Sequence, residues 1–210
     1  MSLLEYILFA GGSLFFIMDP IALIPVFLAI TPQDTPEQRT KMARLACWVA
    51  AGVLIVFTLV GKKLFSFMGI TLPAFKIAGS IVLLLIALDM LRAQRSRVQE
   101  TAEETDAAAA KEDVAITPLA VPMLAGPGAL STVILLQAQA KGWAQEIGLY
   151  GCIAAVCFAS YLILRLASHG AAWISPIALK IITRIMGLLL AAVAVQFILD
   201  ALAELKGRIF

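Results

Sequence analysis

The stretch Ala125-Gly126-Pro127-Gly128-Ala129 interrupts one long apolar segment, and the stretch Met18-Asp19-Pro20-Ile21-Ala22 interrupts another. Each stretch follows the pattern x-(Asp/Gly)-Pro-x-Ala. Proline removes a backbone donor and disrupts a helix, and unpaired backbone groups in hydrocarbon are energetically expensive. Two breaks of the same form therefore indicate that the freed backbone groups serve a purpose, and we expect them to form a ligand or ion site.

The composition is that of an integral membrane protein. Of the 210 residues, 61% are hydrophobic and 14% are charged, and the mean hydropathy is +0.96. A soluble domain has about 45–50% apolar and about 25% charged residues. The net charge of +2 gives no reason to expect a nucleic-acid partner. No basic residue precedes the first apolar run, so this run is not expected to be a cleaved signal peptide.

Six segments are long and apolar enough to cross a bilayer, which requires about 20 residues per helix. The predicted spans cover residues 6–30, 43–61, 73–91, 114–140, 147–166 and 181–205. A polar connector, residues 92–113, separates two halves, residues 1–91 and 114–210. The stretch from His169 to Lys180 is predicted to lie at the membrane interface, because it contains Trp173.

The third spans of the two halves resemble each other. Lys76-Ile77-Ala78-Gly79 and Arg184-Ile185-Met186-Gly187 both place a base, an isoleucine and a glycine at the same spacing. Their separation equals that of the two breaks to within one residue. Because three spans is an odd number, the second half enters from the opposite side. We therefore predict an all-α membrane protein with a three-plus-three inverted repeat, in which spans one and four are broken, as in many secondary transporters.

The basic residues are divided unequally between the two sides of the predicted membrane. The connections after the first, third and fifth spans hold the larger share of the 16 lysine and arginine residues. The positive-inside rule then places both termini on the non-cytoplasmic side.

Several small residues are predicted to serve packing between the helices. Gly151, Ala155 and Ala159 recur every four residues, as do Gly187 and Ala191, and such spacing lets membrane helices approach closely. The cysteines lie in apolar runs and are interpreted as buried packing residues; they are Cys47, Cys152 and Cys157.

Asp19 is an acidic residue near the middle of an otherwise apolar span. An ionisable group at that depth usually marks an ion, proton or substrate pathway. Its carboxylate is predicted to bind the coupling ion or proton, or the ammonium group of a substrate. Alternatively, Asp19 caps the half-helix that follows Pro20, because aspartate is a good N-cap and proline favours the first helical position. The two roles are compatible.

The second break is predicted to begin a half-helix whose exposed amides and positive dipole end suit a carboxylate. Ser131 and Thr132 either add hydroxyl contacts or bond back to their own helix. The predicted substrate-binding residues are Asp19, Pro20, Ala22, Ala125, Gly126, Pro127, Gly128, Ser131 and Thr132.

The remaining polar residues have more ordinary interpretations. Lys76 and Arg184 either extend to the headgroups, which is the favoured interpretation, or form a gating ion pair. The sequence has no phosphate-binding loop, no metal-ligand cluster and no paired carboxylates within one segment. Neither a metal, a cofactor nor an enzymatic activity is therefore predicted.

The chain resembles the MarC family, also described as the neutral amino acid transporter family of bacteria and archaea. The resemblance covers essentially the whole chain, and its motifs are Asp19-Pro20-Ile21-Ala22 through Pro25, Pro73 through Gly79, Ala87 through Leu91, and Pro118 through Gly128.

The resemblance implies a multi-pass protein of the bacterial inner membrane. For members with an assigned substrate, it implies proton- or sodium-linked transport of small neutral amino acids such as glycine, alanine and serine. Where the family commonly has Gly-Asn, this chain has Ala22-Leu23. Two other hypotheses stay open at this point, namely an exporter of another small solute and a non-transporting membrane protein linked to stress or drug response.

Overall fold

The structure is a computed structural model that describes residues 2–32, 34–92, 115–170 and 176–209. Almost all of the polar connector, and the middle of the predicted interfacial stretch, lie outside these ranges. Helices make up nearly all of the described residues, as predicted: α1 (Leu3–Met18), α2 (Pro20–Ile30), α3 (Pro36–Met68), α4 (Leu72–Arg92), η1 (Ala115–Leu124), α7 (Pro127–Gln139), α8 (Trp143–Gly170) and α9 (Pro176–Ile209).

The described helices supply the predicted membrane spans. Five segments are long and apolar enough to cross a bilayer: Leu3–Ile30, Pro36–Gly61, Leu72–Arg92, Trp143–His169 and Ile181–Leu205. The pair η1 and α7 is bent by 54° and provides a sixth span if it is counted as one. The expected all-helical, multi-pass architecture is therefore confirmed.

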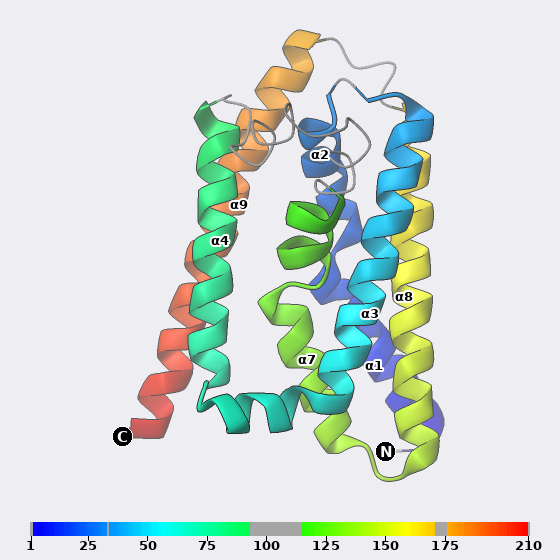
Figure 1. Cartoon of the computed structure of the whole chain (residues 1–210), viewed down its shortest axis with the longest axis vertical. Helices are drawn as coiled ribbons and strands as arrows, with labels where there is room; N and C mark the ends of the chain where they lie inside the picture. Colours follow the sequence, from blue (N-terminus) through cyan, green and yellow to red (C-terminus); the bar gives the residue numbers. More distant parts are fainter. Residues whose placement is uncertain (1, 33, 93–114, 171–175, 210) are drawn as a thin grey trace.

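Consecutive spans run in alternate directions between the two ends of the molecule (Figure 1). The terminal face is the end at which α1 begins and α9 ends. The opposite face is the end at which α2 ends and α3 begins. The last turns of α3, beyond the span that ends at Gly61, lie across the terminal face in Figure 1.

Local sequence signals set several helix ends. Ser2 and Glu5 form a capping box at the start of α1, and Thr35 and Gln38 form another at the start of α3. Such boxes pair two backbone amides that the helix itself leaves free. Gly69 caps the end of α3, and its positive φ of 65° is a conformation that glycine adopts without steric cost.

Helices α3 and α8 pack against each other and form one side of the core. All three cysteines are buried there as predicted, between 4% and 6% exposed. The prediction for the small residues of α8 is wrong: Gly151 and Ala155 are exposed, and the buried face of α8 carries larger side chains such as Ile153 and Leu164. Lipid contacts small and large apolar side chains alike, so residue size alone does not identify the packed face.

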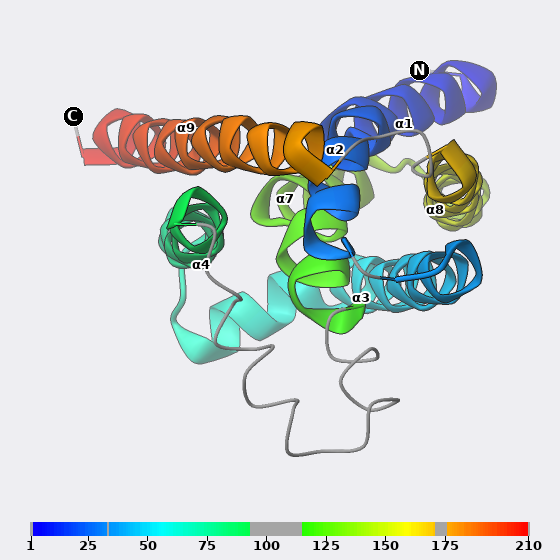
Figure 2. The same cartoon turned by 90° about the horizontal axis from the view of Figure 1, so that it is seen from above.

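Helices α4 and α9 form the other side of the molecule. Gly187 is buried, and a Cβ atom there would lie 3.0 Å from the Ala87 carbonyl oxygen and 3.0 Å from Met90 Cβ. The prediction that Gly187 brings two spans close together is therefore confirmed. Seen from above, α2 and α7 lie between the α4–α9 side and the α3–α8 side (Figure 2).

Helices at corresponding positions of the two predicted halves contact each other. Helix α4 packs on α9, α3 packs on α8, and α1 packs on α7. This pattern of partners supports the inverted repeat, which stays a prediction. Helices α2 and α7, which follow the two breaks, lie in the centre of the molecule (Figure 2).

Two side chains form hydrogen bonds that hold the outer ends of the broken spans. The hydroxyl of Tyr6, at the start of α1, donates to the Leu136 carbonyl near the end of α7 at 2.9 Å. The buried Arg39 guanidinium donates to the Thr31 carbonyl at the end of α2 through Nε at 3.0 Å and Nη2 at 2.7 Å. Each contact satisfies a buried donor with a carbonyl near the end of a short helix.

We expect Tyr6→Phe to lower stability by about 1 kcal/mol, because the substitution removes one buried hydrogen bond and keeps the ring. For a chain of this size that is about 2–4 °C in the unfolding temperature. Heating in detergent with a thiol-reactive dye measures it, because the three buried cysteines react when the helices separate. Tyr161→Phe is the control, since that ring is half-buried on α8. Equal shifts for both variants would show that the Tyr6 bond contributes nothing specific.

Candidate functional site

The first break is a single left-handed residue between two helices. Asp19 has φ 38° and ψ 64°, a conformation that aspartate tolerates better than most residues. Its N–H donates to the Phe15 carbonyl at 3.0 Å, which completes α1. Pro20 has no N–H, so the next carbonyl, that of Phe16, lacks the usual helical donor. The Asp19 carboxylate accepts the Ala22 N–H at 3.1 Å, and this is the predicted cap.

The second break is longer, because several prolines act on it. Thr117 and Val121 each precede a proline and adopt extended backbone, with φ near −130°, as the proline ring requires of the preceding residue. Gly126 then begins α7. A Cβ atom at Gly126 would lie 2.4 Å from the Pro122 carbonyl oxygen, so this position has room for glycine only.

The two half-helices begin alike and differ in their caps. Asp19-Pro20-Ile21-Ala22 starts α2, and Gly126-Pro127-Gly128-Ala129 starts α7. The Asp19 side chain occupies the Ala22 amide, whereas Gly126 has no side chain and α7 has no side-chain cap. The amides of Gly128 and Ala129 lie in the first turn, where a helix offers no carbonyl of its own. The start of α7 can therefore accept an anion.

A cavity of about 340 Å³ lies between the two breaks. It is bounded by α1–α2, η1–α7, α4 and α9, and its lining residues are Ile17, Met18, Asp19, Ala22, Leu23, Pro25, Val26, Leu83, Pro122, Met123, Gly126, Gly128, Ala129, Met186, Leu189, Leu190, Val193 and Phe197. Asp19 is the one ionisable residue among these described lining residues. The breaks stand near the middle of their spans, so the cavity lies deep in the membrane.

The structure brings four of the predicted site residues to the cavity, namely Asp19, Ala22, Gly126 and Gly128. The others are adjacent but do not line it: Pro20, Ala125, Pro127, Ser131 and Thr132.

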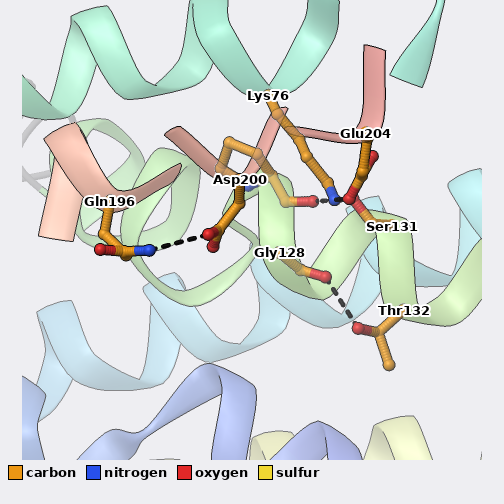
Figure 3. Close-up of polar contacts among 8 residues, drawn as sticks. Lys76, Gly128, Ser131, Thr132, Gln196, Asp200 and Glu204 are labelled. Carbon is orange, nitrogen blue, oxygen red and sulfur yellow. Dashed lines mark hydrogen bonds and ion pairs between the residues drawn. The ribbon is translucent and has the colours of Figure 1, made fainter. Parts of the chain in front are cut away.

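Packing and local hydrogen bonds account for the residues that stay outside the cavity. Pro127 packs on Gly79 of α4, where a Cβ atom would lie 2.3 Å from Pro127 Cγ. The hydroxyls of Ser131 and Thr132 donate to the carbonyls of Pro127 and Gly128 within α7 (Figure 3), the second at 2.9 Å. This is the back-bonding alternative for both hydroxyls.

Sequence reasoning missed the contribution of α9 to the cavity wall. Met186, Leu190, Val193 and Phe197 are spaced by four, three and four residues and therefore share one face of the helix. That spacing is visible in the sequence, but the central turns of α9 carry apolar residues on all faces. The signal that could have identified the cavity-facing row is its continuation into the acidic residues Asp200 and Glu204.

Polar side chains of α4 and α9 form two contacts (Figure 3), of which the one between the helices lies nearer the terminal face than the cavity-lining Leu83 and Phe197. Lys76 of α4 forms an ion pair with Glu204 of α9. The ion-pair alternative for Lys76 is therefore met by a carboxylate on the neighbouring helix, and the extension to the headgroups stays a prediction. One turn earlier on α9, the Gln196 side chain donates to Asp200 at 2.8 Å.

Comparison with known proteins matches the chain over nearly its full length. The profile described as "MarC family integral membrane protein" covers residues 4–206. A UPF0056 membrane protein of Aquifex aeolicus (strain VF5) is 35% identical over 92% of this chain and 90% of its own. Another UPF0056 membrane protein, from Methanocaldococcus jannaschii, is 36% identical over 95% of this chain and 97% of its own. A third, from Escherichia coli (strain K12), is 30% identical over 90% of this chain and 88% of its own. No solved structure matches.

We expect Gly126→Ala to destabilise the protein by about 1–3 kcal/mol, because the added methyl group collides with the Pro122 carbonyl. Gly151→Ala is the matched control: nothing lies within 4 Å of its Cβ position, and alanine favours a helix over glycine by about 1 kcal/mol. Unfolding temperatures in detergent should therefore fall for the first variant and hold or rise for the second. Equal stability of both variants would contradict the tight approach at Gly126.

Proposed function

Because this chain belongs to the MarC family of integral membrane proteins, we propose that it is a secondary transporter of small neutral amino acids. The expected substrates are of the glycine, alanine and serine type, with a proton or a sodium ion as the coupling ion. One observation carries the proposal: a carboxylate and an uncapped helix start face the same mid-membrane cavity.

The two charged features complement a zwitterion. The Asp19 carboxylate attracts an ammonium group, and the free amides of Gly128 and Ala129 with the dipole of α7 attract a carboxylate. Both sets of groups belong to residues that line the cavity. An amino acid bound between them would present no net charge to the surrounding hydrocarbon, which reduces the cost of carrying it across.

The rest of the cavity wall favours a small, mostly apolar side chain. Apart from Asp19, the lining consists of aliphatic, methionine, proline, glycine and phenylalanine residues. The volume of about 340 Å³ lies at the lower end of the range of about 300–1,000 Å³ for small-molecule sites. A large or strongly polar solute would leave unpaired polar groups against this wall.

Ala22 and Leu23 are part of that wall. They stand where the family commonly has glycine and asparagine, so this chain offers a methyl and an isobutyl group where an amide would face the solute. This difference favours alanine over serine as the better substrate of this protein, because a hydroxyl gains no partner from Leu23.

Asp19 also suits the coupling ion. Its carboxylate accepts one backbone N–H and the residue is not buried by protein, so it retains acceptor capacity for a proton or a sodium ion. The Phe16 carbonyl, which Pro20 deprives of its helical donor, adds an acceptor one turn away. In this proposal the coupling ion and the substrate ammonium group compete for, or share, the same end of the cavity.

The architecture supports alternating access. In an inverted repeat one half rocks against the other around a central site, and both breaks stand at the centre of the molecule (Figure 2). In this proposal the terminal face lies on the non-cytoplasmic side of a bacterial inner membrane, which the distribution of basic residues favours.

We expect purified protein in liposomes to take up labelled alanine, glycine or serine saturably when a proton or sodium gradient is imposed. Asp19→Asn should lower the gradient-driven flux by at least roughly tenfold, because it removes the charge. Asparagine still caps α2 and tolerates a positive φ, so the fold is kept.

Unfolding temperatures distinguish the capping role of Asp19 from the role of its charge. Asp19→Asn should unfold at nearly the reference temperature, whereas Asp19→Ala should lose about 1 kcal/mol with the cap. No saturable flux of any of the three amino acids in the reference protein would reject the amino-acid transporter. It would leave export of another small solute, or a non-transporting role, as the function to test.

A further inference from the structure

The cavity is not centred on the two breaks but extends from them toward the opposite face. Ala22, Pro25 and Val26 line it beyond the first break, along α2. Met186 and Leu190 line it on α9, upstream of Phe197 and therefore nearer the opposite face.

Toward the terminal face the cavity ends at a contact of three residues. A Cβ atom on Gly128 would lie 3.2 Å from Ile17 Cγ2 and 3.6 Å from Phe197 Cζ. The end of α1, the start of α7 and the middle of α9 therefore meet here through apolar groups. This contact, the apolar floor, consists of Ile17, Gly128 and Phe197.

Beyond the apolar floor, the cavity-facing rows of two helices become charged. On α9 the spacing of three and four residues continues from Phe197 to Asp200 and Glu204. On α4 the cavity-lining Leu83 shares a face with Lys76, two turns nearer the terminal face. The Lys76–Glu204 ion pair joins α4 to α9 (Figure 3), two helical turns beyond Phe197 on the terminal side.

The ion pair is partly exposed and adds to the packing of α4 on α9. The side chain of Lys76 is 17% exposed and that of Glu204 is 43% exposed. A partly buried pair is screened less than a pair at the surface. Each partner alone, at the end of a membrane span, would be an unpaired charge near hydrocarbon.

Helix α7 is held against the same place. Gly79 lies one turn after Lys76 on α4 and packs on Pro127, the first residue of α7. Separation of α4 from α9 at the ion pair would therefore move the Gly79–Pro127 contact and, with it, Gly128 of the floor. The polar and apolar contacts are mechanically linked.

We propose that the Lys76–Glu204 ion pair and the apolar floor form the gate that closes the cavity from the terminal face. The inference rests on the proposed transport function and adds to it the residues that must separate when the site opens to that side. In the arrangement described here the gate is closed and the cavity extends toward the opposite face.

Solvent accessibility tests the gate without relying on transport. Cys47, Cys152 and Cys157 are replaced by alanine, and Ala22→Cys places one thiol in the cavity wall. Oriented, sealed vesicles are then exposed to a membrane-impermeant maleimide on the terminal face. We expect Glu204→Gln or Lys76→Gln to raise the labelling rate roughly fivefold, as loss of a partly buried pair allows.

Charge reversal and a neighbouring acid provide the controls. The double variant Lys76→Glu with Glu204→Lys should return labelling to the reference rate, since the pair is restored in reverse. Asp200→Asn removes a carboxylate one turn away whose bond from Gln196 lies within α9, and it should leave the rate unchanged. Equal labelling in all variants, or no recovery in the double reversal, would overturn the gate.

A cross-link provides a second readout and separates the two proposals. Lys76→Cys with Glu204→Cys, joined by a reducible bis-methanethiosulfonate cross-linker that replaces the length of the two side chains, should hold the gate closed and stop at least nine-tenths of the flux. Reduction of the cross-link should restore the flux. Flux that persists in the cross-linked protein would reject the gate while leaving transport intact. A reference protein without flux, but with the expected labelling pattern, would reject the transport proposal and retain the gate.

Discussion

A helix in hydrocarbon must satisfy its own backbone, since lipid offers no donors or acceptors, and this requirement governs both breaks. At Pro20 the chain meets the requirement by turning through a single left-handed residue and capping α2 with that residue's carboxylate. At Pro127 it bends by 54° and leaves the first amides of α7 without a side-chain cap. Unpaired groups of this kind persist only where protein or a cavity surrounds them, which explains why both breaks lie at the cavity.

The outer parts of the fold support this centre in a consistent way. Helices α3 and α8 pack through a closely fitted face on one side, and Gly187 brings α9 against α4 on the other. Tyr6 and Arg39 each bind a carbonyl near the end of a half-helix, so α2 and α7 are fixed at the ends that lie away from the cavity. The short helices are thus held at their outer ends while their inner ends remain available for a solute.

The sequence was sufficient for the features that depend on hydrophobicity and on proline. The span boundaries, the two breaks and the cap at Asp19 follow from local composition, and the structure agrees with them. The sequence was insufficient for features that depend on contacts between helices. The cavity face of α9, the Lys76–Glu204 pair and the buried face of α8 all depend on which helix is the neighbour. In an apolar helix, several faces are equally suitable for burial, so periodicity did not distinguish between them.

The difference between the two breaks places a negative charge at one break and a positive helix dipole end at the other. An internal repeat would be expected to produce two similar helix starts facing one space, each with a positive dipole end. Aspartate at position 19 cancels this field at one start and adds a negative charge, whereas glycine at position 126 leaves the field of α7 uncompensated. In the proposed transporter, the difference between Asp19 and Gly126 therefore makes the site suit a dipolar solute rather than two anions. The small size of Gly126 is also required by the Pro122 carbonyl, so backbone packing and ligand chemistry favour the same residue at this position.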